Sequence, residues 1–86
     1  MDKEILIRLK SVGDTIIVKK DSGFSYEVMI LDRKPSYFDC ITTIRSMYEL
    51  YIHRIYFEDL FVHENQLIVT HINVYFHYLD KTKIGN

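Results

Sequence analysis

The chain reads LIVTHINVYFHYL from residue 67 to residue 79, an almost strict alternation of side-chain types. Successive side chains of an extended strand point to opposite faces, so this alternation predicts one strand with two different faces. The face suited to a core consists of Ile68, Thr70, Ile72, Val74, Phe76 and Tyr78. The other face consists of Val69, His71, Asn73, Tyr75 and His77. Because this second face carries imidazole, amide and phenol groups, we interpret it as the candidate functional surface, used for binding or catalysis.

Length and composition predict a single small domain, residues 1–86. Hydrophobic residues make up 48% of the chain, which has seven Tyr, five Phe and no Trp. This is more aromatic surface than so small a core needs, and Tyr in particular favours interfaces. We therefore expect several aromatic side chains at the surface.

Charge and cysteine content narrow the class of protein. The net charge of −1 comes from 11 basic and 12 acidic residues, which argues against both a basic DNA-binding domain and a strongly acidic DNA mimic. Cys40 is the only cysteine, so the internal disulfides usual in small secreted domains cannot form. No signal peptide is apparent, and no apolar run approaches the ~20 residues that span a bilayer. We expect a cytoplasmic protein without a membrane partner.

The N-terminal part predicts a short helix over residues 1–12. Asp2 would cap its start, and Gly13 would end it in a left-handed conformation. One apolar stripe would consist of Ile5, Leu6, Leu9 and Val12. A strand is the alternative, because Ile5 and Leu9 also share one face of a strand.

A β-hairpin is predicted next, over residues 15–20 and 24–31. Both runs are rich in β-branched or aromatic residues, and Asp21-Ser22-Gly23 separates them. Gly23 suits the left-handed position of a three-residue hairpin turn.

A long helix is predicted from residue 37 to an end between residues 50 and 56. Ser36 stands three residues before Asp39, as in a capping box. Side chains recurring at helical spacing are Phe38, Ile41, Ile44 or Arg45, Tyr48, Ile52 and Ile55.

Residues 57–63 fit either a strand or a continued helix. If Glu64 and Asn65 form a two-residue turn, the numbers of paired residues sum to 129. Glu58 then lies opposite His71, a carboxylate–imidazole pair of the kind that acid–base sites use.

The predicted fold is therefore α+β, in the order α-β-β-α-β-β. An antiparallel sheet of three to four strands would carry the long helix on one face. The short helix, a partner or a second copy of the chain would cover the other face, because an aromatic sheet face is costly to expose. We expect a homodimer.

The residues that we expect to bind a partner are His71, Asn73, Tyr75 and His77 on the last strand, with Tyr51 and Arg54 on the long helix. The alternative is a face that is packed against another subunit or simply solvated. The four histidines lack the spacing of metal ligands, so we expect no metal and no other cofactor. Cys40 would lie near a helix start, where a thiol pKa falls, but a lone cysteine is more often a small buried residue.

These features predict a small non-enzymatic regulator or inhibitor that binds a protein surface. The small size, abundant Ile and absence of Ala also fit a protein encoded by a phage or mobile element. The alternative is an RNA-binding protein or metal-independent ribonuclease of the toxin–antitoxin type. In it, His71 or His77 would act as general base, Arg54 would stabilise phosphate charge, and helix tyrosines would stack on bases. A small-molecule sensor formed between subunits has no residue signature here.

Overall fold

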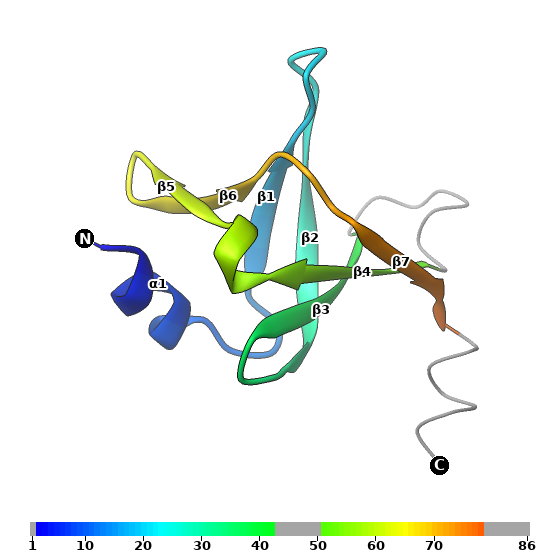
Figure 1. Ribbon diagram of the computed structural model, residues 1–86, viewed down its shortest axis with the longest axis horizontal. Coiled ribbons are helices and arrows are strands. Elements are labelled where there is room, and N and C mark those ends of the chain that lie inside the picture. Colours follow the sequence, from blue (N-terminus) through cyan, green and yellow to red (C-terminus); the bar gives the residue numbers. More distant parts are fainter. Residues whose placement is uncertain (1, 43–50, 79–86) are drawn as a thin grey trace.

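The computed structural model describes residues 2–42 and 51–78, which form one mixed sheet and one short α-helix. In chain order the elements are α1 (Lys3–Leu9), β1 (Thr15–Lys19), β2 (Ser25–Arg33), β3 (Tyr37–Thr42), β4 (Tyr51–Tyr56), the 3₁₀ turn η2 (Phe57–Asp59), β5 (Phe61–His63), β6 (Gln66–Val69) and β7 (Val74–His77). The strand order across the sheet is β5-β6-β1-β2-β3-β4-β7, with α1 and β7 at opposite sides of the molecule (Figure 1).

The last chain segment joins the two edges of a four-strand meander. Strands β1 to β4 pair with one another antiparallel in chain order. β6 then pairs parallel with β1, with Ile17 opposite Ile68, and β7 pairs antiparallel with β4, with Ile52 opposite Phe76. The sheet therefore wraps around its core, as Figure 1 shows. The core cluster consists of Ile7, Ile16, Val18, Val28, Ile30, Phe38, Cys40, Ile55, Leu60, Leu67, Val69 and Ile72.

The predicted α+β fold with a long helix is wrong, because residues 37–42 and 51–56 are strands β3 and β4. These two strands pair antiparallel, from Tyr37 opposite Tyr56 to Ile41 opposite Ile52. Both are rich in aromatic and β-branched residues, which pack well on a pleated surface. The intervening residues of the predicted helix, including Ile44, Arg45 and Tyr48, lie outside the described residues.

The predicted single strand over residues 67–79 is also two strands, β6 and β7, separated by residues 70–73. The face assignment is only partly right for β6, because Ile68 is buried as predicted but Leu67 and Val69 are buried too and enter the core cluster. Of the even-numbered residues predicted to face the core, only Ile72 belongs to that cluster. Within these four residues the chain passes from β6, which lies beside β1, to β7, which lies beside β4. The strict alternation of an extended strand cannot continue through this crossing.

The predicted N-terminal helix is present but shorter. The Asp2 carboxylate accepts a 2.9 Å hydrogen bond from the backbone N–H of Ile5, as an N-cap does. The helix ends at Leu9, so Gly13, with φ +97°, belongs to the following turn and does not cap the helix. Among the described residues, no helix has the length and apolar character needed to cross a bilayer.

The two turn predictions are confirmed. Gly23 has φ +92° in the β1–β2 turn, and the N–H of Lys20 donates to the carbonyl of Phe24 at 2.8 Å. Glu64 and Asn65 both have positive φ between β5 and β6. The β5–β6 pairs follow the sum of 129, for example Phe61 opposite Ile68.

The carboxylate–imidazole pair is not formed between strands. Glu58 lies in η2, where Leu60 N–H donates to the carbonyl of Phe57. His71 lies in the connection between β6 and β7. The pairing of β5 with β6 therefore ends before it reaches either residue.

Candidate binding site

Six aromatic or imidazole side chains gather on the core-facing side of the sheet, at the end away from α1. We call them the aromatic row: Phe24, Tyr26, Tyr51, His53, Tyr75 and His77. Strand alternation places Tyr26 on the same face as Val28 and Ile30, which belong to the core cluster. His53 likewise shares a face with Ile55, and register places Tyr75 directly opposite His53. The row is thus the continuation of the core toward solvent.

The rings of the row contact one another mostly edge to face. His53 lies between Tyr26 and Tyr75, with ring centroids 6.3 Å and 4.8 Å away and interplanar angles of 83° and 74°. The Tyr51 and His77 rings are 5.4 Å apart at 82°. Edge-to-face contact matches the positive edge of one ring to the negative face of the next. These contacts hold rings from β2, β4 and β7 in one continuous surface.

His53 is the buried centre of the row. The residue is 3% exposed, and its Nδ1 has no hydrogen-bond partner among the described residues. Burial, and to a smaller extent the positive charge of Lys20, lowers the pKa of His53 to about 4. The imidazole is therefore neutral at pH 7. Cys40, directly opposite on β3, is also buried, as predicted for a lone cysteine.

Two tyrosine hydroxyls meet beside His53. Burial raises the pKa of Tyr26 to about 12, with the neighbouring Tyr75 and a hydrogen bond to it as further causes. Burial also raises the pKa of Tyr75, and its hydrogen bond with Tyr26 opposes that change. Both phenols are thus protonated at neutral pH. The pair connects β2 to β7 across the two intervening strands, β3 and β4.

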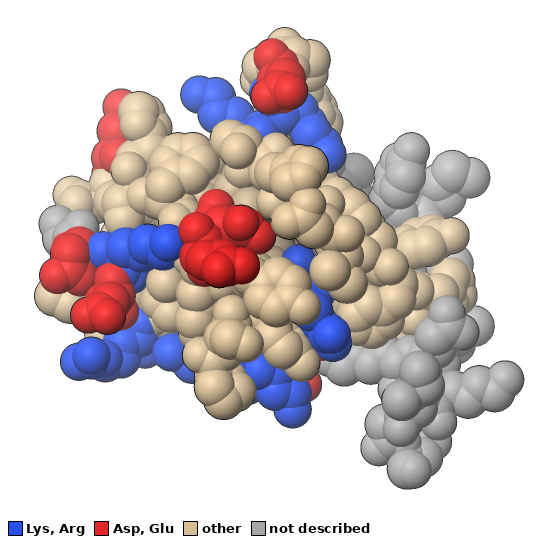
Figure 2. Space-filling model, in the orientation of Figure 1, with Lys and Arg blue, Asp and Glu red and all other residues tan. Residues whose placement is uncertain are grey.

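The outer part of the row is exposed. Tyr75 is 45% exposed and Tyr51 is 42% exposed, and Phe24 is also exposed. Lys20 lies beside the row, with its Nζ 5.9 Å from the centroid of the Tyr26 ring. Figure 2 shows the described surface between the β1–β2 hairpin and β7 almost wholly as uncharged side chains. The described part of this end therefore presents aromatic surface with the Lys20 amine close to it.

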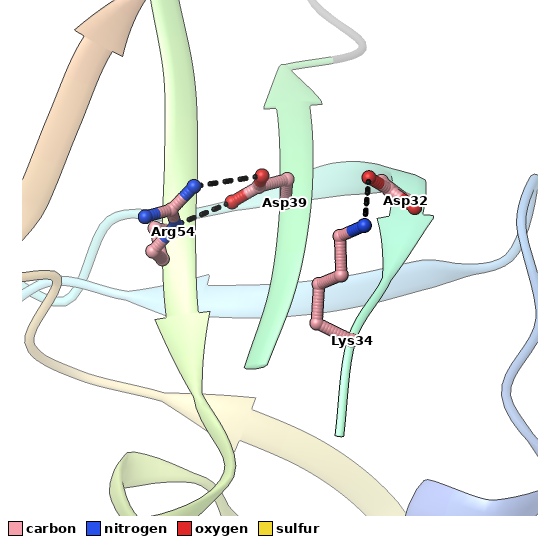
Figure 3. A network of polar contacts seen from close by, with 4 residues as sticks. All are labelled: Asp32, Lys34, Asp39 and Arg54. Carbon is pink, nitrogen blue, oxygen red and sulfur yellow. Dashed lines mark hydrogen bonds and ion pairs between the residues drawn. The ribbon is translucent and has the colours of Figure 1, made fainter. Parts of the chain in front are cut away.

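The opposite face of the same strands holds an ion pair. Figure 3 shows the Arg54 guanidinium from β4 side-on against the Asp39 carboxylate from β3. Nε donates to Oδ1 at 2.9 Å and Nη2 to Oδ2 at 3.1 Å. The guanidinium also lies 4.2 Å from the Tyr37 ring and 5.0 Å from the Phe76 ring. The hydrogen bond to Asp39 is the main cause of the raised pKa of Arg54.

The ion pair between Arg54 and Asp39 has a structural role. Asp39 is 1% exposed, whereas the Arg54 side chain is 27% exposed. A buried carboxylate needs such a partner to remain charged. The nearby pair of Lys34 with Asp32, at 3.5 Å, is exposed at both ends and contributes little (Figure 3).

The structure brings together three of the six predicted binding residues: Tyr51, Tyr75 and His77. His71 and Asn73 are exposed in the connection before β7. Arg54 points to the other face, toward Asp39.

Sequence reasoning missed Phe24, Tyr26 and His53. The alternation of residues 24–31 already placed the first two on one face, whereas the helix prediction hid His53. Once residues 51–56 are taken as a strand, alternation places His53 beside Tyr51.

A separate groove of about 460 Å³ lies between α1 and η2. Its lining combines basic, acidic and apolar residues: Lys3, Glu4, Ile7, Arg8, Arg33, Phe57 and Glu58. Arg33 is engaged there, since its Nη1 donates to the carbonyls of Ile7, at 2.6 Å, and Lys10. The described residues contain no cluster of three or more His, Cys, Asp or Glu that could hold a metal ion. The aromatic row is the better candidate, because its exposed surface is of one chemical kind.

The chain matches no protein-family model, no curated protein and no solved structure. The geometry of the aromatic row is therefore the main indication of function.

Proposed function

We propose that the chain is a small non-enzymatic regulator or inhibitor that acts in the cytoplasm by binding a protein through the aromatic row. The observation that carries this proposal is the exposure of Tyr51 and Tyr75 on a surface anchored by the buried His53 ring. Tyrosine is enriched among the residues that dominate binding energy at interfaces.

The charges around the row favour a protein over a nucleic acid. Lys19 and Lys20 are the basic residues beside the turn of the adjoining hairpin, and Asp21 follows them directly. The only arginine among the predicted binding residues, Arg54, is engaged by Asp39 on the other face. A nucleic-acid site would combine stacking rings with a positively charged track for phosphates. Stacking rings alone fit the apolar centre of a protein interface better.

Affinity capture tests this proposal. The tagged chain is immobilised and exposed to lysate of a low-GC bacterium, with and without nuclease. A stoichiometric protein band that survives nuclease and is lost in Tyr75→Ala supports the proposal. Recovery of nucleic acid, or of partners that disappear with nuclease, would contradict it.

Phe61 supplies a matched control for Tyr75. It is an exposed aromatic residue, 41% accessible, on β5 at the opposite edge of the sheet. Phe61→Ala should leave capture unchanged. A second copy of the chain carrying a different tag shows whether the captured protein is the chain itself, as the expected homodimer requires.

A further inference from the structure

The imidazole of His53 has a nitrogen that lacks a hydrogen-bond partner in the described part of the chain. Its Nδ1 is buried and has no hydrogen-bond partner among the described residues. Native proteins satisfy nearly all buried polar side-chain atoms, because an unsatisfied one loses its hydrogen bond to water without replacement. A ligand that supplied the missing partner would therefore gain affinity at this position.

One of the two tyrosine rings that contact the His53 imidazole is partly exposed to solvent. The rings flanking His53 are those of Tyr26 and Tyr75, and Tyr75 is about half exposed. Tyr75 lies on β7, which pairs with β4 through only four residue pairs among the described residues. Rotation of the Tyr75 side chain would uncover one side of the His53 ring and leave these backbone pairs intact, but it would break the hydrogen bond between Tyr75 and Tyr26.

We propose that the aromatic row contains a ring-binding site centred on His53 Nδ1, and that its ligand is the phenol ring of a tyrosine presented by the partner protein. This inference rests on the proposed function. A phenol ring can replace the edge-to-face contacts that Tyr75 makes with His53. Its hydroxyl can both donate and accept a hydrogen bond, so it satisfies a neutral imidazole in either tautomer. The nearby Lys20 ammonium favours a neutral ring over a cationic side chain.

The test compares p-cresol with toluene as ligands of the intact protein. The two molecules differ only in the hydroxyl, so the ratio of their affinities isolates the hydrogen bond. Titration is followed by the ¹⁵N resonances of the His53 imidazole. We expect p-cresol to bind about tenfold more tightly than toluene and to shift the Nδ1 resonance. His53→Phe should remove the preference, whereas Phe61→Ala should retain it.

Equal affinities for p-cresol and toluene, or an unshifted Nδ1 resonance, would overturn the inference. Tighter binding of adenosine than of p-cresol at His53 would overturn the choice of ligand. The ratio of the p-cresol and toluene affinities, measured on the unmodified protein together with the Nδ1 resonance, tests the inference even if His53→Phe does not fold.

This experiment separates the inference from the proposed function. If capture depends on Tyr75 but p-cresol has no preference, the proposed function stands and the tyrosine site fails. If p-cresol binds at His53 but no protein is captured, the ring-binding site stands, whereas the proposed function fails and with it the assignment of the ligand to a partner's tyrosine.

Discussion

Acidification should destabilise the protein through His53. The imidazole is 3% exposed, and its burial lowers the pKa to about 4, whereas an unfolded histidine titrates near 6.5. Between these values the unfolded chain binds a proton that the folded chain does not. The contribution of His53 to the free energy of unfolding is therefore fully present above pH 6.5. It is lost progressively as the pH falls through about 4.

The size of this loss follows from the difference between the two pKa values. A difference of about 2.5 units corresponds to about 3 kcal/mol of stability. Small domains of this length have about 4–13 kcal/mol in total, so the loss is a large fraction of the margin. Urea unfolding followed by circular dichroism, at half-unit steps from pH 7.5 to pH 4, measures it.

Variants isolate the histidine from the carboxylates that also titrate in acid. The difference in unfolding free energy between the unmodified chain and His53→Phe should change by about 3 kcal/mol across this range. His71→Ala, at an exposed position, should follow the unmodified chain. A pH-independent difference between the unmodified chain and His53→Phe would refute the reasoning.

Three further substitutions test the fold. Arg54→Met should destabilise by about 3 kcal/mol in urea unfolding, because it leaves the buried Asp39 carboxylate without its bidentate partner. Adding Asp39→Asn should recover much of that loss, and no recovery would contradict a buried charge as its cause. Gly23→Ala should lower stability by about 1 kcal/mol because of its φ of +92°, more than Ser22→Ala in the same turn; equal losses would contradict this. Asp2→Ala should cost about 1 kcal/mol and Asp2→Asn much less, and equal thermal shifts would exclude the N-cap as the reason.

Elements with local determinants were predictable from the sequence. The Asp2 cap, the Gly23 turn and the two-residue turn at Glu64 and Asn65 each depend on residues within a few positions of one another. The β5–β6 register follows from that second turn, because a two-residue connection leaves no freedom in pairing.

The central part of the chain was not predictable in the same way. Phe38, Ile52 and Ile55 recur at a spacing that a helix can use, yet Phe38 and Ile55 share the core because they are cross-strand partners. Strand β4 also pairs with β7, which is distant in sequence, so that pairing depends on more than local residues. The favourable strand composition of residues 51–56 was the local signal that the helical stripe outweighed.

The candidate site was likewise predictable only where neighbouring residues in the sequence determine it. Tyr75 and His77 share a face because they are two residues apart on a strand. Tyr51 joins them only because β4 pairs with β7. A helix over residues 51–56 gives His53 no position on the sheet, and no single strand pattern indicates that its imidazole contacts rings from two other strands.

The most direct test of the aromatic row as the binding surface is calorimetric titration of the captured partner with paired variants. We predict that Tyr75→Ala and Tyr51→Ala each weaken the dissociation constant at least about tenfold, while Phe61→Ala changes it less than about twofold. Equal weakening by Phe61→Ala, or unchanged binding in both row variants, would contradict the account.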